Sequence, residues 1–187
     1  FTDSSSTLTR AAYSEYTTTF SSGDRIGIYA LNGTSPVYSN VPFTFDGTSW
    51  TAASTVEYNS NYTYYAYYPY VDDAYAPDFT EATVDNIFSL FISDDTNKFH
   101  YTDQSTLGAF TASDLMIAQG TDTGSDNTIS FQMDHKKGLA VFNGTGAATA
   151  SFKGNKPYLN VSTQYFIMKP NKSTTFLYDL EECTISA

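Results

Sequence analysis

One short run in the chain, Asp122-Thr123-Gly124-Ser125, has the residue types of an aspartic protease turn. In those enzymes two close carboxylates share a proton and activate a water molecule. A working site needs a second such turn or a dimer, with apolar strands around each turn. The chain has no second Asp-Thr-Gly or Asp-Ser-Gly sequence, and the flanking residues are polar. We therefore interpret the run as a turn between two strands.

Nucleophilic and metal chemistry have few candidate side chains. The chain has two histidines, His100 and His135, and one cysteine, Cys183, which is far from both in sequence. This is too few for a histidine-rich metal site, and no Gly-x-Ser-x-Gly turn marks a nucleophile. The place of His135 at the end of an alternating strand is typical of a packed or capping histidine. Loss of an activity in Asp122→Ala or His135→Ala would support the enzymatic alternative.

Calcium and cofactor sites are not indicated either. The Asp-rich loops at 72–73, 94–95 and 122–126 lack the Asp-x-Asp-x-Asp-Gly spacing and distal Glu of a calcium loop. Glycine-rich phosphate motifs and a dinucleotide fingerprint are absent from the sequence. We predict a non-enzymatic protein with no catalytic residue, no cofactor and no metal.

The composition indicates which kind of fold carries these residues. Of the 187 residues, 41% are hydrophobic and 17% aromatic, with Ser, Thr, Asn, Asp and Gly between them. This mixture favours strands and turns over helices, so we expect an all-β protein. The formal charge of −11 would repel a phosphate backbone, which argues against nucleic acid as a partner. No apolar run approaches the roughly 20 residues that a transmembrane span requires.

The predicted fold is organised around the segment Asn61–Val71, in which six of eleven residues are tyrosine. Alternation places Tyr65 and Tyr67 on one face of a strand. The other face carries Tyr62, Tyr64, Ala66, Tyr68 and Tyr70. This pattern predicts a central strand covered on both sides, which should end at Pro69 because proline cannot donate to a sheet ladder.

A hairpin is predicted around Asp46-Gly47. Val41, Phe43 and Phe45 alternate with other residues before this dipeptide, which suits a two-residue type I′ turn. That turn would place Phe45 opposite Thr48 and Phe43 opposite Trp50, giving one aromatic pair across the hairpin.

Alternation predicts further strands along the chain. Arg25–Ala30 carries Ile26 and Ile28 on one face. The other predicted strands are Thr17–Phe20, Ile129–Met133 running on to His135, Gly138–Phe142, Tyr165–Lys169 and Thr174–Leu180. The run Ile87–Ile92 fits either a strand or a buried helix.

Composition divides the chain into three parts. Residues 1–9 are too polar to bury a core and are interpreted as a flexible leader. Residues 10–143 form the predicted β domain. A change to Gly, Ala and Thr follows Asn143, so residues 144–187 are expected to form additional strands or a truncated second domain.

Several short pieces of the chain occur in an informative order. They are Thr9-Arg10-Ala11, Ser22–Tyr29, Asn40–Thr51, Tyr64–Tyr70, Asp103-Gln104-Ser105, Ser113–Ala118, and Ser130-Phe131 with Asp134-His135-Lys136. Together, across about residues 10–142, they resemble the fimbrillin (Mfa-like) family, which comprises pilus subunits and related surface lipoproteins of Bacteroides-type bacteria. The resemblance implies a transthyretin-like, Greek-key β-sandwich followed by a second β-sandwich. The residues after Asn143 are too few for a second domain of the family's size, so that domain would be incomplete.

The resemblance also implies how the protein is displayed and assembled. It implies export as a lipoprotein precursor and display at the cell surface, on the outer membrane or in a fimbrium, with a role in adhesion. In polymerising members an arginine-specific protease cuts near the N-terminus, the first strand leaves, and a strand of a neighbouring fimbrial subunit fills the groove. By motif position, Arg10 and Arg25 are the candidate cut sites. Whether this subunit polymerises, or is a tip, an anchor or a stand-alone surface protein, stays open.

Two sets of residues follow from this interpretation. The candidate donor strand carries the alternating residues Thr174, Phe176, Tyr178 and Leu180. The expected aromatic core contains Phe43, Trp50, Tyr64, Tyr65, Tyr67 and Tyr68.

A surface glycan-binding module is the alternative to a fimbrial subunit. In that case exposed tyrosines or Trp50 would stack on sugar rings of host or bacterial surface glycans, or contact surface proteins. Saturable sugar binding that is lost on tyrosine substitution would support this alternative.

Overall fold

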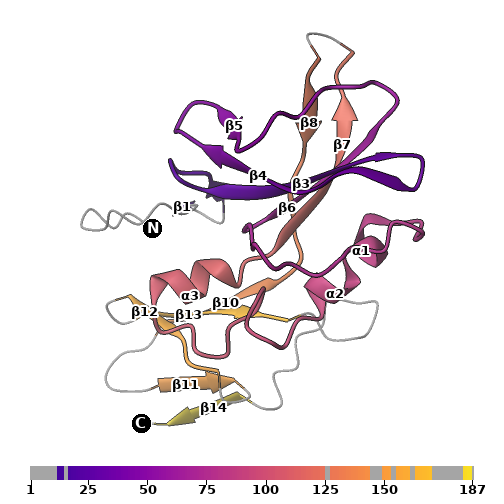
Figure 1. The fold of residues 1–187 in the computed structure, drawn as a ribbon. Helices are drawn as coiled ribbons and strands as arrows, with labels where there is room; N and C mark the ends of the chain where they lie inside the picture. The colour runs from indigo at the N-terminus through magenta and orange to yellow at the C-terminus, as the bar shows by residue number, and fades with distance from the viewer. Residues whose placement is uncertain are drawn as a thin grey trace. The chain divides into compact units, whose positions relative to one another are not determined.

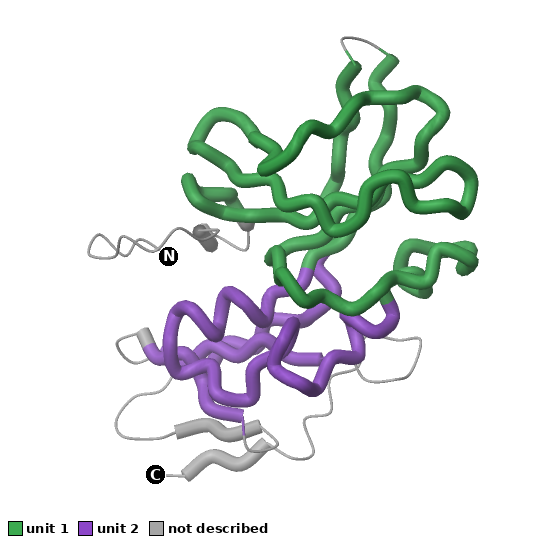
Figure 2. The backbone as a smooth tube through the Cα atoms, in the orientation of Figure 1, with its two compact units in different colours: residues 1–88, 116–134 green, residues 89–115, 135–187 purple. Residues whose placement is uncertain are grey.

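The computed structural model describes residues 12–14, 17–124, 127–143, 149–152, 155–160, 163–169 and 183–186. The chain divides into two compact units, Phe1–Phe88 with Met116–Asp134 and Ser89–Leu115 with His135–Ala187 (Figure 2). Each unit is therefore built from two separate stretches of sequence. The boundary expected after Asn143 lies inside the second unit and stays a prediction.

The first unit is built on one curled antiparallel sheet (Figure 1). Its main strands are β3 Arg25–Asn32, β4 Ser35–Phe45, β5 Trp50–Ala52, β6 Thr63–Tyr68, β7 Met116–Asp122 and β8 Ile129–Phe131, in the spatial order β5-β4-β3-β6-β7-β8. Three consecutive strands, β3 to β5, are followed by β6, which returns to lie beside β3. This is Greek-key connectivity, and the prediction of an all-β, Greek-key fold is confirmed.

Three shorter strands complete this part of the chain. They are β1 Ala12–Ser14, β2 Thr17–Thr19 and β9 Asp134–His135. β1 and β2 pair as an antiparallel hairpin, and β2 falls within the strand predicted at Thr17–Phe20.

Side chains pack on both faces of β6, as its tyrosine pattern predicts. On one face Ala66 and Tyr68 form an apolar cluster with Ile26 and Ile28 of β3. The strand ends at Tyr68, directly before Pro69. The predicted central strand is therefore confirmed, because β6 is paired on one side with β3 and on the other with β7.

The opposite face of β6 is covered by aromatic rings. Tyr67 packs against Tyr29 of β3 and against Phe88, with ring centroids 6.1 and 6.3 Å away. Tyr65 contacts Phe79 at 5.6 Å and Phe88 at 6.4 Å. Tyr65 and Tyr67 thus lie on the same face of β6, as their spacing predicts.

The hairpin of β4 and β5 forms where it was expected, but the predicted pairing of Phe43 with Trp50 is wrong. Phe45 lies opposite Trp50 and Phe43 lies opposite Ala52. The aromatic pair is therefore Phe45 and Trp50, whose ring centroids are 5.1 Å apart.

The side chain of Asp46 explains this register. Its Oδ1 accepts hydrogen bonds from the backbone N–H groups of Thr48 and Ser49, both at 2.7 Å. These bonds stabilise a loop over residues 46–49. A type I′ turn would need positive φ at both Asp46 and Gly47, and of these two only Gly47 has it, with φ of 104°.

The run Ile87–Ile92, which the sequence allowed to be either a strand or a buried helix, is helical. It contains the end of α1 Val84–Ile87 and the whole of α2 Ser89–Ile92. The hydroxyl of Thr83 caps α1 by accepting a hydrogen bond from the N–H of Asn86 at 3.3 Å. Phe88, between the two helices, is fully buried.

The described part of the second unit contains two small antiparallel sheets and two helices, α2 and α3. One sheet has the order β10-β13-β12, formed by Gly138–Asn143, Thr163–Met168 and Tyr158–Asn160, and in the other β11 Thr149–Phe152 pairs with β14 Cys183–Ser186. The strands predicted at Gly138–Phe142 and Tyr165–Lys169 are thus confirmed. Helix α3 Leu107–Ala112, which the sequence analysis missed, stacks the ring of Phe110 on that of Tyr158 at 5.5 Å.

Two further predictions concern segments outside the described residues. They are the flexible leader at residues 1–9 and the strand at Thr174–Leu180. In the part of the chain that is described, no helix is long and apolar enough to cross a membrane.

Candidate functional site

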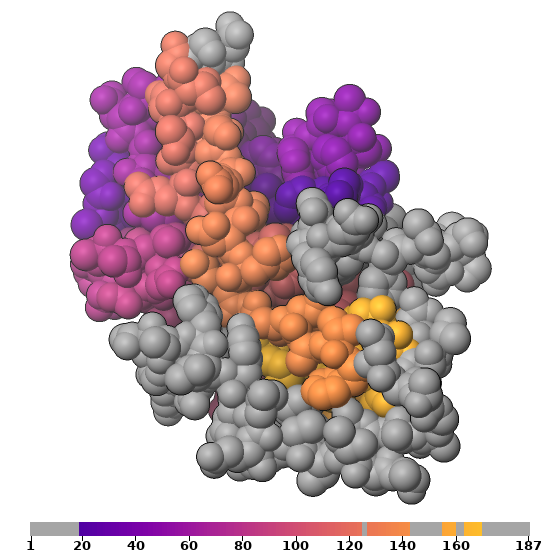
Figure 3. All heavy atoms as spheres, turned by 180° about the vertical axis from the view of Figure 1, so that it is seen from behind, coloured from indigo at the N-terminus to yellow at the C-terminus, as the bar shows by residue number. Residues whose placement is uncertain are grey.

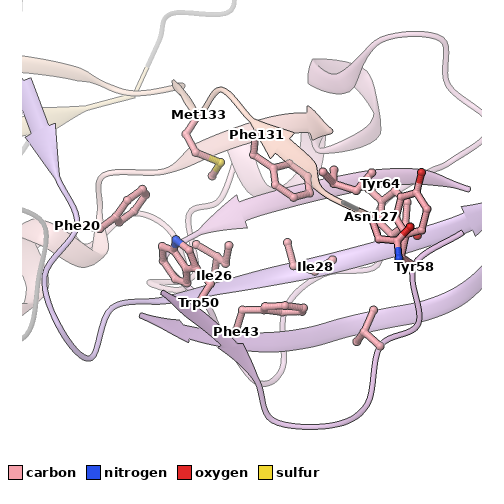
Figure 4. A pocket seen from close by; sticks show the side chains of 12 residues that line it. Phe20, Ile26, Ile28, Phe43, Trp50, Tyr58, Tyr64, Asn127, Phe131 and Met133 are labelled. Atoms are coloured by element: carbon pink, nitrogen blue, oxygen red, sulfur yellow. The ribbon is translucent and has the colours of Figure 1, made fainter. Parts of the chain in front are cut away.

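The curled sheet of the first unit carries an open apolar groove with a volume of about 360 Å³. In the space-filling view the hollow lies between the β7–β8 hairpin, in orange, and β4 and β5, in purple (Figure 3). Its lining side chains are Phe20, Ile26, Ile28, Phe43, Trp50, Val56, Tyr58, Tyr64, Asn127, Ile129, Phe131 and Met133 (Figure 4).

Alternation along two strands supplies the walls of this groove. Ile26 and Ile28 point into it from β3, at the bottom of the sheet's curl. From β8 and its continuation, Ile129, Phe131 and Met133 point into it, while the residues between them are exposed. A strand lying in the groove would therefore meet apolar side chains on two sides.

Gly120 of β7 lets β8 lie close to its neighbour. A Cβ atom at Gly120 would stand 2.5 Å from Cγ2 of Ile129 and 2.9 Å from Cε1 of Phe131. Both distances are too short for a side chain, so a glycine is needed for these two residues to form the groove wall.

Two strand edges border the groove. Among the described strands, β5 is paired only with β4, and β8 only with β7. The second edge of each strand therefore presents N–H and C=O groups to which a further strand can pair. An apolar groove between two such edges is suited to an extended peptide with alternating apolar side chains.

Of the two predicted cut sites, Arg25 is described and Arg10 is not. Arg25 is the first residue of β3, where it lies opposite Thr44 of β4. Its carbonyl accepts a hydrogen bond from the N–H of Tyr70 at 3.0 Å, and its guanidinium lies 4.3 Å from the centroid of the Tyr70 ring. The backbone around Arg25 is thus held within the sheet.

The Asp122-Thr123-Gly124 run is a hairpin turn between β7 and β8. The carboxylate of Asp122 accepts hydrogen bonds from the hydroxyl of Tyr58 at 2.6 Å and from the N–H of Gly124 at 2.8 Å. These bonds lower the pKa of Asp122, and the first of them raises the pKa of Tyr58. Asp122 thus holds Tyr58 in place at one end of the groove, as a single exposed carboxylate.

His135 contacts a carboxylate in the second unit. Its Nδ1 lies 2.8 Å from Oδ1 of Asp114, which is buried. His135 itself is exposed, so it is not packed in a core but is paired with a buried carboxylate. Among the described residues, no three His, Cys, Asp or Glu side chains gather in a way that would hold a metal ion.

A buried group of charged residues also lies in the second unit. The carboxylate of Asp94 accepts a hydrogen bond from the N–H of His100 at 3.1 Å, and the ammonium of Lys137 donates to the carbonyl of Ile92. Burial lowers the pKa of His100 to about 4, with Lys137 and Lys169 adding to the effect, and burial lowers the pKa of Lys137 to about 7. None of these groups lines the groove of the first unit, and we expect them to affect the free energy of unfolding.

The six residues expected in the aromatic core differ in burial. Tyr64, Tyr67 and Tyr68 are buried, at 5%, 0% and 2% exposure. The other three, Phe43, Trp50 and Tyr65, are half-buried. Phe43 and Trp50 line the groove together with Tyr64. The four residues of the candidate donor strand lie outside the described part of the chain.

Sequence reasoning found the strands of the groove but not the groove itself. The alternation of Ile26 with Ile28, and of Ile129, Phe131 and Met133, was visible as two apolar faces. Nothing in the sequence indicated that the sheet curls so that these faces meet. Val56 and Tyr58 come from the β5–β6 connection, and they carry no periodic signal.

Comparison with known proteins gives consistent matches. A family model described as fimbrillin-like matches residues 9–182. A Bacteroides ovatus protein named as a fimbrium tip subunit is 30% identical over 141 residues, which cover 71% of this chain and 25% of that protein. The chain therefore spans about a quarter of the length of this relative.

Two crystal structures have a similar fold. A fimbrial protein from Bacteroides ovatus matches with a TM-score of 0.63 and 24% identity, over 81% of this chain and 37% of that one. A Bacteroides uniformis protein described as a cell adhesion protein matches with a TM-score of 0.52 and 19% identity, over 83% and 71% of the two chains. At these identities the likeness shows the fold alone.

Proposed function

Because the chain belongs to the fimbrillin-like family, we propose that it is a fimbrial subunit that joins neighbouring subunits by strand insertion. An extended segment of a neighbour would lie in the apolar groove and pair with the edge of β5 or β8, completing the sheet. The observation that carries this proposal is the groove itself, which is open, apolar and bordered by two strand edges. Main-chain hydrogen bonds would give affinity, and alternating side chains would set the register.

The inserted segment would supply large apolar side chains at alternate positions. Each such side chain that fills the groove would contribute about 1.5–3 kcal/mol from apolar burial. In this chain the alternating residues Thr174, Phe176, Tyr178 and Leu180 have the required pattern. We propose that this segment acts as the donor strand toward the next subunit.

Processing at Arg10 would precede assembly. Proteases cut most readily at exposed, unpaired backbone. The pairing of Arg25 within β3, and its bond to Tyr70, oppose cleavage there. We therefore propose Arg10 as the site that an arginine-specific protease cuts.

The proposed place of the protein is the cell surface, in a fimbrium or on the outer membrane. Export as a lipoprotein precursor belongs to the same proposal, as does a structural, adhesive role without catalysis. The apolar character of the groove supports this role, because acid–base chemistry needs convergent polar groups that the groove's apolar length does not supply.

Cleavage followed by size measurement tests the proposal. The protein is treated with an arginine-specific protease, cut sites are read by mass spectrometry, and mass in solution is followed by size-exclusion chromatography with light scattering. We expect a cut at Arg10 followed by growth into oligomers. Arg10→Lys should abolish both, because lysine keeps the charge but is not cut, whereas Arg25→Lys should change neither.

A second pair of variants separates groove insertion from other modes of association. Phe131→Asp places a charge on the groove wall and should prevent oligomers after cleavage. Ser130→Asp places the same charge on the outward face of β8 and should allow them. A stable monomer after cutting at Arg10, or equal assembly by both variants, would contradict the strand-insertion mechanism.

The glycan-binding alternative has less support from the groove. The ring of Trp50 lies 5.1 Å from Phe20 and 5.1 Å from Phe45, so neighbouring rings occupy part of its surface. Saturable binding on a glycan array by the uncut protein, lost in Trp50→Ala, would favour that alternative.

A further inference from the structure

The two ends of the groove differ in chemistry. At one end lie Phe20, Trp50 and Met133, which offer aromatic rings and a thioether (Figure 4). At the other end lie Tyr58, Tyr64 and Asn127, which bring two hydroxyls and an amide together (Figure 4). An occupant therefore meets an apolar surface at one end and hydrogen-bonding groups at the other.

A negative charge accompanies the polar end. The hydroxyl of Tyr58 donates to Oδ2 of Asp122 at 2.6 Å, and the N–H of Gly124 donates to Oδ1 of the same carboxylate at 2.8 Å. Both bonds favour the ionised form, so the pKa of Asp122 is lowered. Asp122 is exposed, and a carboxylate has lone pairs left to accept from an arriving cation.

We propose that these unlike ends fix the direction in which a strand enters the groove. The occupant is an extended segment of another subunit, with apolar residues at alternate positions and a lysine or arginine at the end beside Tyr58 and Asp122. This inference rests on the proposed strand insertion and adds the partner's charge pattern. In the reversed direction the cation would lie against Phe20 and Trp50 instead of Tyr58 and Asp122, and an apolar side chain would cover the polar end.

The expected discrimination is modest but measurable. A solvent-exposed ion pair changes affinity by roughly two- to five-fold, and added salt reduces the effect. The apolar side chains of the inserted segment supply most of the affinity, whereas Asp122 favours one of the two directions in which the segment can lie.

The single tryptophan of the chain, Trp50, lines the groove and provides a direct readout. The probes are tryptophan-free peptides in which Val, Phe and Leu alternate with Thr. One carries Lys at its first position, one carries Lys at its last position, and two counterparts carry Glu instead. Peptide binding is followed by the change in Trp50 fluorescence of the protein after cleavage at Arg10, at low and at high salt.

We expect one of the two Lys peptides to bind more tightly than its Glu counterpart, and the difference to shrink in high salt. Asp122→Asn removes the charge and keeps one acceptor oxygen for the N–H of Gly124, while its NH2 group can donate to the Tyr58 hydroxyl. This variant should abolish the preference. Asp85→Asn removes an exposed charge of α1 and should retain the preference.

Different failures have different meanings. If the peptides bind but Lys and Glu versions have equal affinity, or if the preference persists in Asp122→Asn, the direction-setting role is overturned and strand insertion stands. If no peptide changes the fluorescence of Trp50 at any concentration, strand insertion and the inference built on it both fail.

Discussion

The ring of Tyr67 lies across Gly27 on the neighbouring strand. The two residues are opposite each other in the β3–β6 pair, and a Cβ atom on Gly27 would stand 2.1 Å from Cε1 and 2.5 Å from Cζ of that ring. This placement lets the Tyr67 hydroxyl donate to Oδ1 of Asn40 at 2.6 Å. The Tyr67 hydroxyl also accepts a hydrogen bond from the N–H of Val71 at 3.2 Å. The lack of a side chain at Gly27 thus allows the fully buried Tyr67 of β6 to pack across β3 and to bond to β4 and to the chain that follows β6.

Gly27→Ala should destabilise the protein by about 1–3 kcal/mol, since the added methyl group overlaps the Tyr67 ring in a packed core. Urea unfolding followed by far-UV circular dichroism measures the change. The matched control is Gly108→Ala in α3, where a Cβ would have its nearest contact at 3.8 Å. Alanine favours a helix interior by up to about 1 kcal/mol over glycine, so this variant should be as stable as the wild type or more so. Equal losses in both variants would show that the Tyr67 contact is unimportant.

In the second unit, the side-chain amide of Gln104 bonds to the backbone of β13 as a neighbouring strand would. Its Oε1 accepts from the N–H of Ile167 at 2.8 Å, and its Nε2 donates to the carbonyls of Ile167 and Tyr101, both at 2.9 Å. Gln104 is fully buried. These bonds satisfy both backbone groups of Ile167 on the side of β13 that faces the segment carrying Gln104.

Gln104→Leu should cost about 2–4 kcal/mol of unfolding free energy, because it leaves buried backbone groups of Ile167 without partners. Thermal or urea unfolding checks this value. Gln132→Leu changes an exposed glutamine of the first unit and should alter stability by less than about 0.5 kcal/mol. A loss below about 1 kcal/mol for Gln104→Leu would mean that water or another group replaces the amide.

Much of the fold followed from the sequence because strand alternation is a local signal. Tyr65 and Tyr67 were assigned to one face of β6 and Ala66 and Tyr68 to the other, since side chains two apart must share a face. The register of the β4–β5 hairpin did not follow in the same way. It depends on hydrogen bonds from Asp46, and the Asp-Gly dipeptide is compatible with more than one turn.

The candidate site was less accessible to sequence reasoning. Tyr58 and Asp122 are 64 residues apart, and no pattern in either segment indicates their contact. Helix α3 was missed for another reason. It is short, and its main signal is the cap by Thr106, whose hydroxyl accepts from the N–H of Ala109 at 3.1 Å.

Stability should fall in mild acid because of His100. The pKa of His100 is about 4 in the folded protein, against 6.5 for an ordinary histidine. The unfolded chain therefore binds more protons between these values. The contribution of His100 is intact above about pH 6.5, declines as the pH falls and is lost near pH 4, for a total of about 3 kcal/mol.

Urea unfolding at several pH values between about 4 and 7 tests this dependence. His100→Gln should remove most of the slope, although nearby Asp94, Lys137 and Lys169 stay in place. A slope that survives in His100→Gln would assign the acid sensitivity to the carboxylates.

Lys137 should produce an effect on the alkaline side. Its pKa is about 7 in the folded state and 10.5 ordinarily, so the unfolded chain again binds more protons between the two values. Unfolding free energy should therefore rise by about 2–3 kcal/mol from pH 7 to about pH 9.5. Lys137→Met should show no such rise, while the neighbouring change Lys136→Met should retain it. The range stops short of the usual tyrosine pKa, because Tyr29 and Tyr67 have raised pKa values in the folded state and would oppose the trend at higher pH. A flat profile in the wild type, or a rise that persists in Lys137→Met, would mean that Lys137 is not held in its deprotonated form by burial.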